Sequence, residues 1–284
     1  MHTMWKGSIQ FGLVSIPIKM HAATEDKDVS FRNLHEKCKT PIKYEKVCPV
    51  CEEKVEKEDL VKGYETTNGS FVVVKNEELE EIRQEAGEKA VEILDFINMD
   101  DIDPIYFNRS YYLGPNEGGT KAYTLLRKAL HDSKKVGIAK IMLRSKEQLA
   151  VLRIYQNTIL LETLHYPDEI RKSADVPNVP EEDNVEEKEL NTAKMLIDQL
   201  TAEFEPEKYV DEYRQKLLDL IQAKERGEEV VSVQEEPPKD NVADLMEALQ
   251  ASVDKNKKKK SPAGASKKKT SQKSAAQQTK KKAT

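Results

Sequence analysis

The sequence predicts an α+β protein with a strand-rich body, a helical appendage and a lysine-rich tail. Residues 3–166 contain short apolar runs with two-residue alternation, separated by turn residues, which is typical of strands. Residues 189–226 instead repeat their apolar side chains every three to four positions, which is typical of helices. Residues 255–284 contain twelve lysines, no acidic residue and too few apolar side chains to build a core.

Within the body, the pattern predicts an order of elements. A helix begins behind the cap residue Asn76, and a second helix runs from Thr120 with Tyr123 and Leu130 on one face. Residues 173–190 are expected to form a linker, because prolines and a run of acids interrupt the pattern. Strands are expected on both sides of a turn near Gly12 and then at 69–75, 90–99, 105–115, 136–144, 148–155 and 158–166.

The appendage is expected to hold two helices, at 189–204 and 206–226. A third, short amphipathic helix is expected at 241–253, capped by Asn241 or Asp240. Its apolar stripe consists of Val242, Leu245, Met246, Leu249 and Val253.

The net charge of −5 hides two parts of opposite sign. Without the twelve lysines of residues 255–284, the chain has 34 Lys and Arg against 51 Asp and Glu, which leaves −17. Lysines that neutralise phosphates release counterions, so such a tail gives affinity for nucleic acid that ignores sequence. A tail that serves only solubility is the alternative.

All three cysteines lie in HEKCKTPIKYEKVCPVC, residues 35–51. His35, Cys38, Cys48 and Cys51 have the paired spacing of a tetrahedral zinc site, and four protein ligands leave no open position for a substrate. Structural zinc is one interpretation; a Cys-x-x-Cys redox pair and ligand-free cysteines are the others. Glu52 occupies the position after the second thiolate, where a glycine often relaxes the backbone.

The basic residues around these cysteines also allow two interpretations, a solvated loop face or an extended segment that faces phosphates. They are Arg32, Lys37, Lys39, Lys43 and Lys46.

The sequence contains no pattern that predicts an enzyme. It lacks a Gly-rich phosphate loop, a G-x-S-x-G motif and an H-E-x-x-H motif. It also lacks a signal peptide and any apolar run near the ~18 residues that span a bilayer, so a cytoplasmic protein is expected.

Taken in order, several stretches resemble the prokaryotic Ku family. They are MWKGSIQFGLVSIPIKM, SFRNLHEKC, IKYEKVCPVC, EILDFINMDDIDPIYFNRSYYLGP, GGTKAYTLLRKAL, LHYPDEIR and NVADLMEAL, the last placed ahead of the lysine tail. This collinear order covers nearly the whole chain and is more specific than any single motif.

The resemblance implies a Ku-type β-barrel core with a DNA-encircling bridge loop, a helical dimerisation arm and a disordered basic C-terminal tail. It places the core at 1–180 with the bridge at about 28–68, the arm and C-terminal helix at 181–254, and the tail at 255–284. It further implies a ring-shaped homodimer that threads onto double-stranded DNA ends and recruits an ATP-dependent DNA ligase, ligase D, for non-homologous end joining. Such a protein would act in the cytoplasm, on the nucleoid.

The same resemblance implies roles for particular residues. Candidates for the DNA-facing wall are Arg32, Lys37, Lys39, Lys43, Lys46, Lys134, Lys135, Arg144, Lys146, Lys6 and Lys19, with tail contacts from Lys257, Lys258, Lys259, Lys260, Lys267, Lys268 and Lys269. The dimer face is assigned to Leu196, Leu200, Tyr213 and Leu217, although these helices could also pack on their own barrel. The ligase-docking helix is assigned to Leu245, Met246 and Leu249, although it could also cap the dimer core.

Two other functions are weighed against this one. A nucleoid-type DNA- or RNA-binding protein would act mainly through its basic tail. A zinc-dependent enzyme would need an open coordination position, which four protein ligands argue against.

Overall fold

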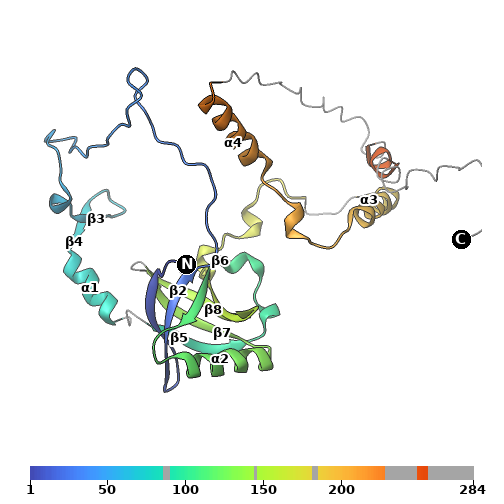
Figure 1. Cartoon of the computed structure of the whole chain (residues 1–284), viewed down its shortest axis with the longest axis horizontal. Helices are drawn as coiled ribbons and strands as arrows, with labels where there is room; N and C mark the ends of the chain where they lie inside the picture. The colour runs from blue at the N-terminus through green and yellow to red at the C-terminus, as the bar shows by residue number, and fades with distance from the viewer. Residues whose placement is uncertain (86–89, 144–145, 181–184, 228–247, 255–284) are drawn as a thin grey trace, which may run out of the picture. The chain divides into compact units, whose positions relative to one another are not determined.

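The barrel is the central feature of the computed structural model, which describes residues 1–85, 90–143, 146–180, 185–227 and 248–254. The chain divides into two compact units, Met1–Asn178 and Val179–Thr284. Seven strands of the first unit close into the barrel (Figure 1). They are β1 (Trp5–Phe11), β2 (Val14–Ala22), β5 (Ala90–Ile97), β6 (Phe107–Pro115), β7 (Val136–Leu143), β8 (Lys146–Tyr155) and β9 (Thr158–Leu164).

Around the barrel the strands follow the order β1-β2-β6-β9-β8-β7-β5. Neighbouring strands are antiparallel, except that β1 and β5 close the barrel as a parallel pair. The β1–β2 hairpin turns at Gly12, whose φ of +56° is a left-handed conformation that glycine adopts without a Cβ clash. The barrel therefore has no open sheet edge at which another strand could pair.

Alternate residues of the strands point inward and fill the barrel. Ile9, Ile18, Leu113, Leu152 and Leu161 are fully shielded from solvent. Because β-strands alternate their faces with a period of two, the same strands present polar side chains outside. A second apolar cluster lies against β7, β8 and β9, where the segment that follows β5 packs.

Helix α2 (Thr120–Ser133) packs against the barrel (Figure 1). Its Tyr123 is buried, and the hydroxyl donates to the carbonyl oxygen of Leu113 at 2.6 Å. The Tyr123 hydroxyl oxygen in turn accepts the backbone N–H of Ile159 at 3.0 Å. One side chain thus joins α2 to both β6 and β9.

The remaining elements of the first unit lie outside the barrel. Strands β3 (Lys62–Glu65) and β4 (Phe71–Val74) form a separate antiparallel pair, followed by α1 (Asn76–Glu85). Short 3-10 helices are η1 (Lys57–Asp59), η2 (Met99–Asp101), η3 (Pro104–Tyr106), η4 (Pro167–Glu169) and η5 (Ser173–Asp175).

The second unit contains α3 (Glu187–Leu200), η6 (Pro206–Lys208) and α4 (Glu212–Glu225), with a helical turn at 248–254. The predicted helices at 189–204 and 206–226 were too long, because residues 201–211 are not α-helical. Thr201 ends α3 in an extended conformation, and Pro206 lacks the N–H that a continuing helix needs. Phe204 and Tyr209 stack across this break with ring centroids 5.7 Å apart.

Every predicted barrel strand is confirmed, as are the helices behind Asn76 and from Thr120. The strand β3 was not predicted. Among the described residues, no helix is both long and apolar enough to cross a membrane. The ends predicted for the 241–253 helix fall partly outside the described residues, which include only its final turns.

Candidate nucleic-acid interface

The basic residues of the predicted bridge lie on a long extended segment between β2 and β3 (Figure 1). All five are exposed, and none has an ion-pair partner among the residues that the structure describes. An unpaired ammonium or guanidinium in solvent is available to a phosphate without first breaking another contact. These residues are Arg32, Lys37, Lys39, Lys43 and Lys46.

The cysteine segment forms two turns with the same backbone hydrogen bonds. In the first, His35 donates to the carbonyl of Thr40 at 2.9 Å and accepts from Lys39 at 2.8 Å. In the second, Cys48 donates to the carbonyl of Glu53 at 3.0 Å and accepts from Glu52 at 2.9 Å.

The residue after each ligand pair has a left-handed backbone, with φ of 53° at Lys39 and 56° at Glu52. Glycine is often found at the position of Glu52 in such motifs, because glycine adopts a left-handed backbone easily. The structure confirms that this position is left-handed, although here it carries a glutamate side chain. Each turn brings one predicted ligand pair together: His35 Nδ1 lies 3.1 Å from Cys38 Sγ. Within the described ranges, no three metal-ligating side chains meet at one point.

The thiols in these turns are more acidic than an ordinary cysteine. Hydrogen bonds from the Thr40 side chain and then from His35 lower the pKa of Cys38 to about 7. Hydrogen bonds from Cys51 lower the pKa of Cys48 to about 7. Both sulfurs are therefore partly thiolate near neutral pH, which is the form that binds a metal.

The outer face of the β1–β2 hairpin places two predicted DNA-binding residues side by side. Lys6 and Lys19 are directly opposite each other in the antiparallel register. Residues of this parity face away from the core, whereas the adjacent Ile18 points inward. Neither lysine has an ion-pair partner in the described part of the chain, so this hairpin presents two like charges together.

The other predicted lysines differ in their surroundings. Lys134 ends α2 in a left-handed conformation with φ of 54°, and Lys135 donates to Asn98 Oδ1 at 2.7 Å. Both keep an unneutralised charge. Arg144 lies outside the described residues.

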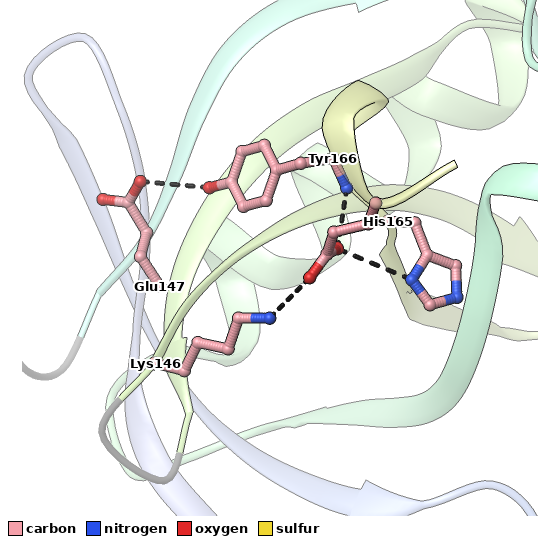
Figure 2. Close-up of polar contacts among 5 residues, drawn as sticks. Lys146, Glu147, His165 and Tyr166 are labelled. Atoms are coloured by element: carbon pink, nitrogen blue, oxygen red, sulfur yellow. Dashed lines mark hydrogen bonds and ion pairs between the residues drawn. The ribbon is translucent and has the colours of Figure 1, made fainter. Parts of the chain in front are cut away.

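Lys146 belongs instead to a polar cluster at the ends of β8 and β9 (Figure 2). Its Nζ lies 2.6 Å from Glu169, which also accepts the backbone N–H of Tyr166 at 2.9 Å. His165 Nδ1 is 3.5 Å from the same carboxylate. A phosphate would have to compete with Glu169 for this ammonium, in contrast to the bridge lysines.

The cluster shifts two titrations in opposite directions. The hydrogen bond from Lys146, and then that from the backbone of Tyr166, lowers the pKa of Glu169 to about 2. Burial raises the pKa of Tyr166 to about 12, helped by its hydrogen bond to Glu147 at 3.0 Å. Both groups therefore keep one protonation state across the neutral range, and the cluster acts as a fixed polar clasp.

Sequence reasoning missed Arg109, which is exposed and lines a cavity of about 400 Å³ with Trp5 and Gln148. The sequence could have indicated it, because Arg109 is two and four residues before Tyr111 and Leu113, which face the barrel interior on the same strand.

The predicted dimer residues lie on the helices of the second unit. Leu196 and Leu217 are half-buried, while Leu200 is 61% and Tyr213 is 76% exposed. Of the predicted docking helix, Leu249 is half-buried, and Leu245 and Met246 lie outside the described residues. The tail lysines Lys257, Lys258, Lys259, Lys260, Lys267, Lys268 and Lys269 lie outside them as well.

Comparison with known proteins shows the family to which the chain belongs. Residues 10–192 match the family model described as the Ku70/Ku80 beta-barrel domain. A protein of Bacillus subtilis (strain 168) named "Non-homologous end joining protein Ku" is 57% identical over 259 residues, covering 91% of this chain and 83% of that protein. Proteins of the same name are 43% identical in Heliobacterium modesticaldum, covering 90% and 92%, and 48% identical in Desulfitobacterium hafniense, covering 89% and 87%.

The chain therefore belongs to the Ku family of non-homologous end joining proteins. This confirms the predicted resemblance, the α+β β-barrel fold class and the prediction that the protein is not an enzyme. The individual DNA, metal and dimer residues stay predictions.

Proposed function

We propose that this chain binds double-stranded DNA ends without sequence specificity, as a ring-shaped homodimer, and recruits an ATP-dependent DNA ligase in end-joining repair. The observation that carries the proposal is the match of residues 10–192 to the Ku family, together with a long segment that carries exposed, unpaired cations. The ring would act in the cytoplasm, on the nucleoid.

The charge distribution supports binding that ignores sequence. The bridge cations and the Lys6–Lys19 pair are long, flexible ammonium or guanidinium groups on exposed segments and on a hairpin. Such groups contact phosphate oxygens, whereas base reading needs ordered donors placed in a groove. An acidic remainder of the body keeps separate rings from associating.

The second unit supports a homodimer. Leu200 and Tyr213 expose most of their apolar surface on α3 and α4. Isolated helices with an exposed apolar face gain stability when that face is covered. In this proposal the partner copy covers it, which in obligate dimers commonly buries more than ~2,000 Å².

A structural zinc ion is part of the proposal. His35, Cys38, Cys48 and Cys51 would hold it, because each turn already presents one ligand pair with matching backbone geometry. The ion would supply a crosslink between the two turns of an otherwise extended segment. Purified full-length chain should contain about one Zn²⁺ per copy. Cys48→Ser should lose the zinc, and protease should then cleave the segment faster. If wild-type protein stripped of metal resists protease as well as untreated wild type does, zinc has no structural role here.

The ligase contact is assigned to the amphipathic helix that the sequence predicts at 241–253. An apolar stripe flanked by acids is suited to a groove on another protein. Pull-down of an ATP-dependent ligase D by the full chain, with and without Leu249→Asp, would test the assignment.

The experiment that tests threading compares linear duplex with a covalently closed circle of the same sequence. At a salt concentration that weakens the tail, the circle should compete poorly. Equal competition would reject the ring.

A nucleoid-type protein is the second candidate, and the twelve lysines of the tail favour it. Deleting residues 255–284 distinguishes the two. The ring keeps its preference for linear duplex without the tail, whereas the nucleoid-type protein loses nearly all binding.

A further inference from the structure

An apolar groove runs along α2 on the first unit, with the predicted DNA-binding residue Lys135 at one end. Its volume is about 540 Å³, and α2, the β1–β2 hairpin and β5 form its walls. Leu125 on α2 is 71% exposed, Phe96 on β5 is 47% exposed and Val14 on β2 is 42% exposed. Phe11 and Phe96 meet edge to face at its base, with ring centroids 6.4 Å apart.

The lining decides what kind of molecule the groove can hold. Its walls consist almost wholly of Phe, Val, Ile, Leu and Ala side chains, with Ser133 and Lys135 at one end. Such walls offer phosphates no row of donors, so nucleic acid is excluded as the occupant. Apolar surface of this kind gains ~25 cal/mol per Å² when another apolar surface covers it.

The dimensions favour one helix over a second copy of the chain. The groove follows α2 from Ala122 to Ser133, which at 1.5 Å per residue is roughly 16 Å, or three helical turns. A helix of that length inserts three or four side chains. The area involved falls short of the ~1,200–2,000 Å² that a stable protein–protein interface buries, so the contact suits a transient partner.

Lysines at the rim of the groove favour a partner with negative charge. Lys121 and Lys128 lie four residues before and three residues after Leu125, so all three share one face of α2. Both lysines are exposed and have no ion-pair partner in the part of the chain that the structure describes. Lys135 closes one end and keeps its charge, because its partner Asn98 is neutral. A body whose remaining charge is strongly negative thus presents a cationic rim here.

We infer that the α2 groove docks a short amphipathic helix of another protein, with apolar residues at i, i+3, i+4 and i+7 and carboxylates on both flanks. The apolar residues insert beside Leu125, and the carboxylates meet Lys121 and Lys128. Apart from Lys135 at one end, none of its lining residues is a predicted DNA contact, and Leu125, Lys121 and Lys128 belong neither to the bridge nor to the outer face of β1–β2 that carries Lys6 and Lys19.

The test uses the full-length chain and a fluorescein-labelled 16-residue peptide with leucine at the four apolar positions and glutamate on both flanks. Two further peptides replace the glutamates with lysine or the leucines with serine. Anisotropy is measured for wild type, Leu125→Asp and the double variant Lys121→Glu/Lys128→Glu. Ile105→Asp is the control, because Ile105 is 57% exposed on the first unit and outside the groove.

The acidic leucine peptide should bind wild type and Ile105→Asp equally and should bind Leu125→Asp at least ~10-fold more weakly. The double lysine variant should lose most of its affinity while keeping its fold, since both positions are exposed. Absence of peptide binding to wild type, or equal binding by Leu125→Asp, overturns the proposal.

Two other results would also overturn it. Equal binding of the glutamate and lysine peptides would reject the acidic class of partner. A change in oligomeric state for Leu125→Asp by light scattering would make the groove an interface between copies. Binding to linear duplex DNA, measured on the same samples, should be unchanged in Leu125→Asp, so failure of this inference and failure of DNA end binding are distinguishable.

Discussion

Neutralising the Lys6–Lys19 pair should strengthen the fold while weakening DNA binding. The two lysines are directly opposite on β1 and β2, where Cβ atoms lie ~4.5–5.5 Å apart and like charges are destabilising by ~0.2–1 kcal/mol. We therefore expect Lys6→Gln/Lys19→Gln to raise the free energy of unfolding by that amount, and the melting temperature by ~0.4–4 °C.

The same double variant removes two predicted phosphate contacts. Each contact on duplex DNA contributes ~0.9 to the slope of log K against log salt, and a homodimer carries two such pairs, so the slope should become shallower by ~3.6. Anisotropy titrations of a linear duplex at four or more salt concentrations measure the slope, and thermal unfolding measures stability.

Lys54→Gln is the matched control, because Lys54 is already paired with Glu45 at 2.9 Å. It should leave the salt slope unchanged. A slope that is also unchanged in the double variant, together with the expected rise in stability, would show that the pair faces solvent rather than DNA.

Two further predictions concern stability. Tyr123→Phe should destabilise the barrel by ~1–3 kcal/mol in urea unfolding. The reason is that the N–H of Ile159 and the carbonyl of Leu113 both lose their hydrogen bond to the Tyr123 hydroxyl. An unchanged unfolding midpoint would mean that water replaces the hydroxyl. Glu169→Gln should reduce the loss of unfolding free energy between about pH 4.5 and pH 2. The Lys146 side chain lowers the pKa of Glu169 from 4.5 to about 2, so the stability that ionised Glu169 contributes is present above about pH 4.5 and is lost as the pH falls towards 2. If wild type and this variant lose stability in parallel across that window, the clasp contributes nothing.

The barrel could be predicted from the sequence because its strands bury one face and alternate with a period of two. β2 illustrates this, since its buried positions Ile16, Ile18 and Met20 alternate with more exposed ones. β3 was missed because both faces of Lys62–Glu65 are exposed, so no alternation marks it. The helix ends near residues 201–211 were missed because apolar spacing continues through a segment that Pro206 breaks.

The sequence identifies candidate cations but not the side chains with which they pair. The sequence identified Lys146 and Lys39 alike as cations near the bridge or the hairpin. Only the folded chain shows that Glu169, far along the sequence, pairs with Lys146 and leaves Lys39 unpaired. Long-range pairing of charges depends on strand register, which composition does not encode.

The central claim is that two copies enclose the double helix, and end blocking tests it most directly. The full chain is loaded onto a linear duplex with biotin at both ends, streptavidin is added, and excess competitor DNA follows at a salt concentration that weakens the tail. Enclosure predicts that blocked duplexes retain the protein while open duplexes lose it. Equal rates of loss from blocked and open duplexes would contradict a closed ring.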